Sequence, residues 1–171
     1  MSWPTATILL FLAVCAQVTV APLFPVAAAI PDMVLVAFVL VVAFAGARTS
    51  MVALPFIALG LGFLIGREPG LLLLAYLPAL PLARWMELSA PRGATPFQRL
   101  LAVTFLTGLW ARSLLALGAI VNGADFEGSV LVARILLPGA VLDLALLGVA
   151  YLPHRALRWR VRPLELARSG F

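Results

Sequence analysis

Apolar residues form long runs along this chain, and a few charged positions divide the runs into segments. Each segment has about the length of a membrane-spanning helix, which needs about 20 mostly apolar residues. The runs lack the alternation of apolar and polar residues that marks a membrane-spanning strand. The pattern therefore predicts an all-α integral membrane protein, a single bundle of six spans followed by a short tail. The expected spans are 5–24, 26–46, 50–66, 70–84, 97–121 and 128–152, and the tail covers 154–171.

The composition strengthens this interpretation. Hydrophobic residues make up 64% of the 171 residues and charged residues 11%, whereas soluble domains are about half apolar and about a quarter charged. A soluble fold would therefore have too few polar side chains to cover its apolar surface. In hydrocarbon a helix satisfies its own backbone hydrogen bonds, so helices are the expected spanning elements.

The distribution of arginines predicts the orientation of the bundle. All twelve basic residues are arginines, and an even number of spans puts both termini on the same side of the membrane. With the termini inside, the inner segments hold nine arginines, the outer loops hold only Arg67, and one outer loop carries Asp125 and Glu127. Because inner loops are enriched in basic residues, both termini are expected in the cytoplasm.

The segment after the last span is rich in arginines separated by apolar residues. The simpler interpretation is a stop-transfer tail that lies beside anionic head groups, and a dedicated partner site is the less favoured one. The arginines of this basic cytoplasmic tail include Arg155, Arg158, Arg160 and Arg162.

Two charged residues fall deep inside predicted spans. Arg112 lies near the middle of the fifth span and Asp143 near the middle of the sixth. With a rise of 1.5 Å per residue, their depths differ by only a few Å, and the short connecting loop makes the two helices antiparallel neighbours. An isolated charge at this depth costs about 2.5 kcal/mol or more. We therefore expect an intramembrane ion pair, either a substrate or proton path or a structural clasp that sets the helix register.

A third charge, Arg134, lies nine residues before Asp143, on the opposite face of the same helix. It is close to the predicted outer end of the span, so it is expected to reach outward or to meet an acidic residue there. Its candidate partners, in an outer-face or partner contact, are Glu68, Asp125 and Glu127.

Few residues suit catalysis or metal binding. The single histidine, His154, and the single cysteine, Cys15, are too few for a zinc site of the usual kind. Serines such as Ser50 and Ser113 have no histidine within the membrane to activate them, and no phosphate-binding loop with a lysine is present. We therefore expect a protein that is not an enzyme and has no cofactor or metal. Without a soluble basic domain, nucleic acid is not expected as a partner.

The third predicted span contains a cluster of small residues. Gly62 and Gly66 are spaced as GxxxG, and Gly60 lies beside them. Small residues at this spacing let helices approach closely, and packing inside the bundle is favoured over contact with a partner protein.

Short motifs occur in a characteristic order at the ends of the predicted spans. Gln17 lies near the end of the first span, and residues 31–35 (PDMVL) open the second. Residues 58–66 (ALGLGFLIG) end the third, 136–142 (LLPGAVL) lie in the last, and 151–153 (YLP) precede the tail. In order and spacing these motifs resemble the MreD family, the rod-shape-determining membrane proteins of bacteria, over nearly the whole chain. Residues 67–70 (REPG) depart from the family's Asp-Leu-x-Ser-Gly-like stretch, so no family role is carried over to them.

The resemblance implies a non-enzymatic scaffold of the cell-shape and peptidoglycan elongation machinery, the rod complex, in the bacterial inner membrane. The implied partners are an MreC-like single-span protein, a RodA-like glycosyltransferase and a class B penicillin-binding protein.

A second hypothesis comes from a different functional class. The MreD family is similar in architecture to the substrate-binding components of energy-coupling-factor vitamin transporters, which are also small six-helix proteins. Such a component needs a polar and aromatic pocket near its outer face, whereas the outer loops here are short and poor in polar residues, so the scaffold is favoured. The residues expected to line such a pocket are Trp110, Arg112, Asn122, Phe126 and Arg134.

Overall fold

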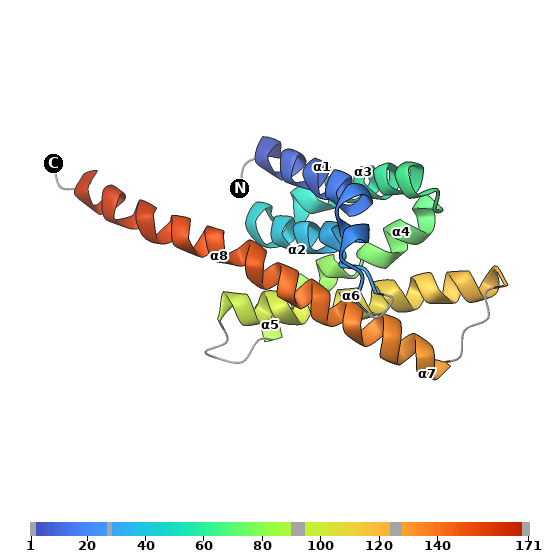
Figure 1. Ribbon diagram of the computed structural model, residues 1–171. Helices are drawn as coiled ribbons and strands as arrows, with labels where there is room; N and C mark the ends of the chain where they lie inside the picture. The colour runs from blue at the N-terminus through green and yellow to red at the C-terminus, as the bar shows by residue number, and fades with distance from the viewer. Residues whose placement is uncertain (1–2, 27–28, 90–94, 124–127, 169–171) are drawn as a thin grey trace.

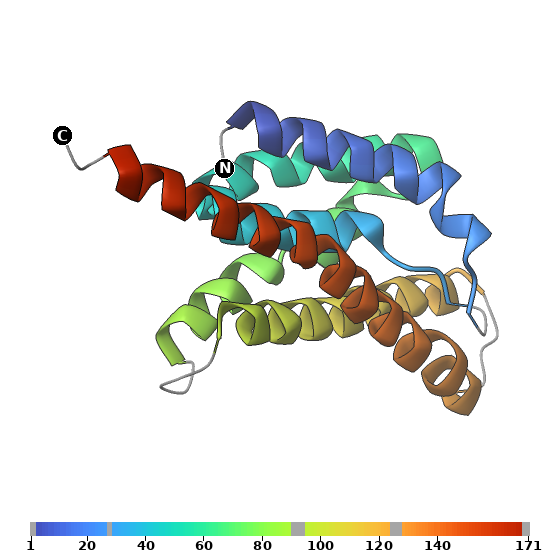
Figure 2. The same cartoon turned by 60° about the vertical axis from the view of Figure 1, so that its left-hand side comes forward.

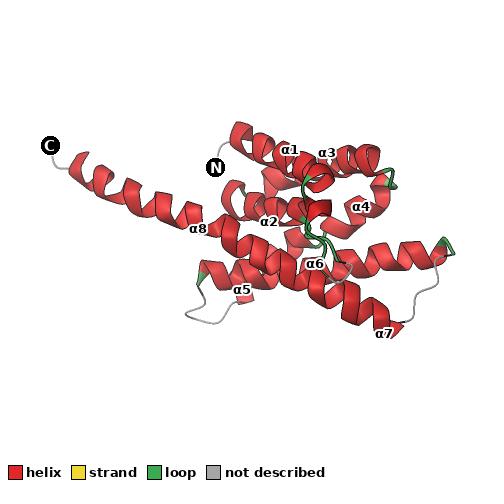
Figure 3. Cartoon of the chain, in the orientation of Figure 1, coloured by secondary structure: helices red, strands yellow, loops and turns green. Residues whose placement is uncertain are grey.

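The computed structural model describes residues 3–26, 29–89, 95–123 and 128–168. Within these ranges the chain is helical apart from short turns and one isolated bridge (Figure 3). The helices are α1 (Trp3–Thr19), η1 (Ala21–Leu23), α2 (Met33–Ala45), α3 (Ala47–Ile65), α4 (Pro69–Tyr76), α5 (Ala79–Ser89), α6 (Pro96–Val121), α7 (Gly128–Leu131), the π-helical η2 (Val132–Leu136) and α8 (Leu137–Arg168).

Several helices have the length and composition of membrane-embedded segments. In the described part of the chain, four segments are long and apolar enough to cross a membrane. By contrast, α2 has only 13 residues and is about 20 Å long, against about 30 Å for the hydrocarbon core of a bilayer. The four long segments are Trp3–Leu23, Arg48–Ile65, Pro96–Val121 and Gly128–Leu152.

The short helix α2 forms the centre of the bundle (Figures 1 and 2). It is surrounded by α1, α3, α5, α6 and α8, all of which contact it. Residues 34–42 are all buried, and they are apolar on every side of the helix. A helix that is apolar all round is stable only when it is enclosed, and α2 supplies a larger share of the buried core than any other described helix.

The start and end of α2 follow from local sequence. The helix begins at Met33, seven residues after the predicted start of the second span. Pro31 has no backbone N–H and disfavours helical geometry in the preceding residue, and Asp32 then caps the helix. At the other end, Gly46 alone separates α2 from α3, and its φ of +87° is a conformation that favours glycine.

The fourth predicted span is divided into α4 and α5, because Pro78 interrupts the backbone hydrogen bonds. An α-helix would bond the N–H of residue 78 to the carbonyl of Leu74, but proline has no N–H to donate. The indole N–H of Trp110 on α6 donates to the Leu74 carbonyl instead, at 3.1 Å. The break therefore leaves that carbonyl satisfied, as burial in hydrocarbon requires, and joins α4 to α6.

The last predicted span forms one continuous helical segment with a π-helical turn. The N–H of Leu137 bonds to the carbonyl of Val132, five residues back, directly before Pro138, which cannot donate a hydrogen bond. The helix then continues to Arg168 rather than ending near Leu152, and this C-terminal part extends beyond the bundle (Figure 1). The structure describes its backbone from residue 153 onward but not its side chains.

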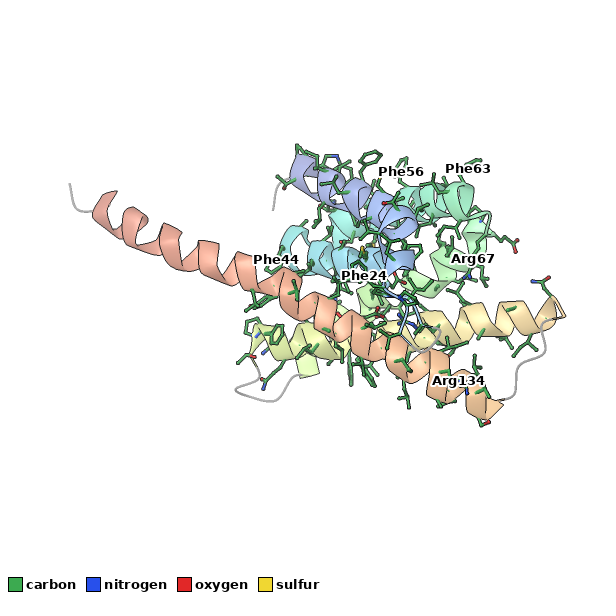
Figure 4. The ribbon with its side chains drawn as sticks, viewed as in Figure 1. Phe24, Phe44, Phe56, Phe63, Arg67 and Arg134 are labelled. Atoms are coloured by element: carbon green, nitrogen blue, oxygen red, sulfur yellow. The ribbon has the colours of Figure 1, made fainter. Side chains whose placement is uncertain are left out.

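Large apolar side chains cover the outside of the bundle. On α3, Phe56 is 69% exposed and Phe63 is 84% exposed, and both project away from the other helices (Figure 4). On α1, Phe11 and Leu12 are also exposed. An apolar surface of this extent needs a hydrocarbon environment or a partner protein.

Candidate functional site

The two charges predicted inside the membrane meet at the start of α2. The guanidinium of Arg112 on α6 pairs with the carboxylate of Asp143 on α8: Nη1 approaches Oδ2, and Nη2 lies 2.9 Å from Oδ1. Arg112 Nη2 also donates to the carbonyl of Ile30 at 3.3 Å. Asp143 is fully buried. The pair is therefore bidentate, the geometry in which guanidinium–carboxylate contacts are strongest.

The first backbone N–H groups of α2 are satisfied by side chains from other helices. The N–H of Asp32 donates to Asp143 Oδ1 at 2.8 Å, and the N–H of Met33 donates to Gln17 Oε1 at 2.7 Å. Gln17 on α1 also donates through Nε2 to the carbonyl of Pro31 at 3.2 Å. Helix N-termini have unpaired donors that burial makes costly, so these contacts stabilise the end of α2 inside the bundle.

The side chain of Asp32 is the N-cap of α2. Its carboxylate accepts the Leu35 N–H at 2.8 Å and the hydroxyl of Tyr76, on α4, at 3.0 Å. The N-terminus of a helix carries roughly half a positive charge, and both Asp32 and Asp143 lie against it. Two carboxylates, one guanidinium and one helix terminus thus form the polar cluster, which we define as Gln17, Asp32, Tyr76, Arg112 and Asp143.

Two glycines make room for the ion pair. A Cβ atom on Gly108 of α6 would lie 3.1 Å from Asp143 Oδ2 and 3.3 Å from Arg112 Nη1. A Cβ on Gly139 of α8 would overlap the guanidinium of Arg112. Each glycine precedes one of the two charged residues by four positions, so it lies one helical turn away on the same face.

A cavity of about 510 Å³ lies next to the polar cluster. It occupies the end of the bundle that contains the connection between α3 and α4, beyond the N-terminus of α2. We call this end the cavity half and the end filled by α2 the α2 half. Gln17, Asp32, Tyr76 and Arg112 form the polar lining beside α2, and Arg67 adds a second arginine from the connection between α3 and α4. Most other lining residues are apolar, such as Leu61, Leu64, Ile65, Leu72, Leu115, Leu131 and Ile135.

The predicted small-residue cluster in α3 serves contacts inside the chain. A Cβ on Gly62 would lie 2.7 Å from the ring of Pro69 and 2.9 Å from the carbonyl oxygen of Arg67. Gly66 ends α3 with φ of +70° and donates to the carbonyl of Gly62. Gly60 faces Val14 of α1 at an ordinary contact distance. The turn from α3 into α4 therefore depends on Gly62 and Gly66.

The other predicted site residues do not join the polar cluster. Arg134 on η2 and Glu68 at the start of α4 are both exposed, and the structure records no ion pair between them. Figure 4 shows Arg67 and Arg134 on opposite sides of α6. Asp125 and Glu127 lie outside the described residues, and so do the side chains of the predicted basic tail, Arg155, Arg158, Arg160 and Arg162.

The predicted pocket residues are only partly brought together. Of the five, Arg112 lines the cavity. Trp110 instead donates to the backbone of α4, and Asn122 caps the end of α6 by donating to the Gly118 carbonyl. Phe126 lies outside the described residues. The cavity beside the polar cluster is thus closer to α1, α3 and α4 than the pocket that the sequence indicated.

The chemistry of the polar cluster is that of a stable electrostatic contact. Each charged group is held by an opposite charge, a hydroxyl or a backbone N–H, and no serine or cysteine lies within it. Within the described ranges, no three His, Cys, Asp or Glu side chains are grouped closely enough to hold a metal ion. The cluster joins α1, α2, α4, α6 and α8 at one point, which sets their relative register.

In comparisons with known proteins, no protein-family model, no curated protein and no solved structure matches the chain.

Proposed function

We propose that this protein is a non-enzymatic membrane scaffold of the bacterial wall-elongation machinery, similar in role to the MreD proteins. The proposal starts from the ordered motifs that resemble that family, above all the Pro31-Asp32 pair. The observation that supports it best is the use of these residues at the start of α2. Pro31 accepts a hydrogen bond from α1, and Asp32 accepts one from α4 and donates one to α8. The motif therefore has a structural role of the kind that a rigid scaffold requires.

In this proposal the chain crosses the bacterial inner membrane six times, with both termini in the cytoplasm. The second crossing is the short α2 with the chain that precedes it, and the fourth is the broken pair α4 and α5. The arginine distribution supports this orientation. The cavity half then faces the outer leaflet, and the α2 half faces the cytoplasm.

The scaffold function is compatible with how the chain distributes its polar and apolar groups. The intramembrane charges satisfy one another, whereas the exposed faces of α1 and α3 carry large aromatic and aliphatic side chains. Such faces bind lipid or the transmembrane helices of partners. The proposed partners are an MreC-like single-span protein, a RodA-like glycosyltransferase and a class B penicillin-binding protein.

Co-purification in a mild detergent tests the proposal. The tagged full-length chain should retain a single-span protein with a periplasmic coiled coil, together with the wall-elongation enzymes. An Asp143→Ala variant should lose these partners in proportion to its loss of folded protein, whereas Arg134→Ala serves as an exposed control. Recovery of none of these proteins from a well-folded preparation would contradict the scaffold.

The cavity supports a second candidate function, the substrate-binding component of an energy-coupling-factor vitamin transporter. Its volume of about 510 Å³ falls within the range of small-molecule sites, about 300–1,000 Å³. The same co-purification distinguishes the two functions, because recovery of an ATPase with a tightly bound vitamin would favour the transporter component and exclude the scaffold.

A further inference from the structure

The cavity exists because the central helix is short. α2 spans about 20 Å and begins at the polar cluster, whereas α6 has 26 residues and continues past this point for about nine more. Of the helices that surround α2, α1, α3 and α6 extend beyond its N-terminus and line an open-sided space that no side chain of α2 occupies. Asp32, Tyr76 and Arg112 form the floor of this space where α2 begins.

The walls of the cavity favour an apolar ligand. They come from α1, η1, α3, α4, α6, α7 and η2, and their lining residues are mostly leucine, isoleucine, alanine and valine. The cavity volume of about 510 Å³ falls within the range of small-molecule sites, about 300–1,000 Å³. This is enough room for an alkyl chain with a small head group.

The charges on the floor favour a cationic head group. The polar cluster contains the two carboxylates of Asp32 and Asp143 but only one guanidinium, and Arg112 pairs with Asp143. Asp143 does not line the cavity, whereas Asp32 does. The hydrogen-bond donors to the Asp32 side chain, Leu35 N–H and the Tyr76 hydroxyl, carry no formal charge.

The N-terminus of α2 offsets only part of this excess. It contributes roughly half a positive charge, and its first donors are already used by Asp143, Gln17 and Asp32. At this floor, a negatively charged group would find no free backbone donor, would lie next to the Asp32 carboxylate, and would meet an Arg112 guanidinium already paired with Asp143. The other guanidinium of the lining, Arg67, belongs to an exposed residue of the connection between α3 and α4 and is not part of the polar cluster. A positively charged ligand would supply the charge that the cluster lacks.

We propose that this cavity binds an ammonium-bearing amphiphile, with its alkyl chain along the apolar walls and its ammonium group at Asp32. The ligand has two natural sources, the ethanolamine head group of a phospholipid or a soluble hydrophobic amine. Arg67, which is exposed and lines the cavity, distinguishes them, because it lies where a phospholipid phosphate would be attracted and has no role for a simple amine. The site does not depend on the proposed scaffold function.

Thermal unfolding of the full-length chain in a neutral detergent tests the site with three probes of equal chain length. Octylammonium, octanol and octanoate share the same alkyl chain and differ only in the head group. A ligand that binds the folded state raises the unfolding temperature with concentration. We expect octylammonium to bind about tenfold or more tightly than octanol, and octanoate to bind more weakly than both.

Two substitutions connect binding to the cavity. Asp32→Asn should abolish the preference for octylammonium over octanol. Ala119→Phe, which fills the cavity from α6 without touching the charges, should weaken binding of all three probes about tenfold or more. The matched control is Ala145→Phe, at an exposed position of α8 that does not line the cavity, and it should bind the probes as the unmodified chain does.

Native mass spectrometry of the chain extracted from phospholipid vesicles identifies the source. The lipid head group is supported if the chain retains an ethanolamine phospholipid in preference to phosphatidylglycerol. In that case Arg67→Gln should lose the lipid but still bind octylammonium. Octylammonium binding without lipid retention would support a soluble amine.

The proposal is wrong if octanoate binds as tightly as octylammonium, if all probes bind equally, or if Ala119→Phe leaves binding unchanged. The Ala119→Phe result stands even where Asp32→Asn fails to fold.

Discussion

The two halves of the bundle differ in what occupies the space between their helices. In the α2 half, a central helix with nine consecutive buried residues fills the space between its neighbours. In the cavity half, the neighbouring helices continue without a central helix, and a cavity of about 510 Å³ remains. Three helices, α1, α3 and α6, therefore pack against a central helix at one end and line an open site at the other.

The difference lies in where the central helix begins. A helix that starts in the middle of a bundle exposes backbone donors where no bulk water can satisfy them. Here the first donors are bound by Gln17, Asp143 and Asp32, which come from three different helices or their caps. The polar cluster is thus the boundary between the two halves, and it makes a short central helix possible.

The most damaging change should be removal of one charge at this boundary. Asp143→Ala leaves Arg112 buried without its partner, and we expect a loss of about 3 kcal/mol or more in the free energy of unfolding in detergent. The double variant with Arg112→Ala should lose less than the sum of the two single variants. Strictly additive losses would show that the two side chains do not interact, and Arg134→Ala, at an exposed position, should change stability little.

A smaller loss should follow from Gly139→Ala. The added Cβ would overlap the Arg112 guanidinium, so the ion pair must shift, at a cost of about 2 to 3 kcal/mol. Gly148→Ala on the same helix is the matched control, because nothing lies within 4 Å of its Cβ position. Thermal unfolding should separate the two variants clearly, and equal stability would show that Gly139 does not make room for the pair.

Loss of the Tyr76 hydroxyl should have a moderate effect. Tyr76→Phe removes one donor to Asp32 but keeps the ring packed on α4, so we expect a loss of about 1.5 kcal/mol. The same variant leaves the Asp32 carboxylate less satisfied, so octylammonium should stabilise it by at least as much as it stabilises the unmodified chain. An unchanged unfolding temperature without ligand would show that the hydroxyl does not support the cap.

The smallest effect, and one of opposite sign, is expected in the α2 half. Thr104 and Thr107 on α6 are fully buried, and their hydroxyls have no hydrogen-bond partner in the structure. Because an unpaired buried hydroxyl is costly, Thr107→Val should leave stability unchanged or raise it by up to about 1 kcal/mol. Thr107→Ala, which leaves a cavity instead, is the control and should destabilise the protein.

The sequence predicted the ion pair because both of its members lie in long helices joined by one short loop. Helical rise then relates residue number to depth, and Arg112 and Asp143 fall at similar depths. Gly108 and Gly139 each lie four positions before one of the two charges, which places them on the same helix face. This spacing is visible in the sequence and indicates where the helices have room for the ion pair. The division of the fourth span at Pro78 likewise follows from the missing N–H of proline.

Other members of the polar cluster were outside the reach of sequence patterns. Gln17 and Tyr76 contact Pro31, Asp32 and Met33 across 14 to 44 residues of chain, and nothing in their local sequence indicates which helix they face. The same limit affected the expected pocket, where Trp110 and Asn122 bond to nearby backbone instead. Contacts of this kind depend on how helices rotate against one another.

By itself, the sequence determined a helical protein with membrane-embedded segments and the pairing of its two deepest charges. Apolar run length and the cost of an unpaired charge in hydrocarbon are properties of single segments, so they can be read without a fold. Only the tertiary structure decided that α2 is short and central, that its N-terminus meets four other helices at the polar cluster, and that a cavity remains beyond it. These features arise from which faces of the helices pack together, and that choice is made by the whole bundle at once.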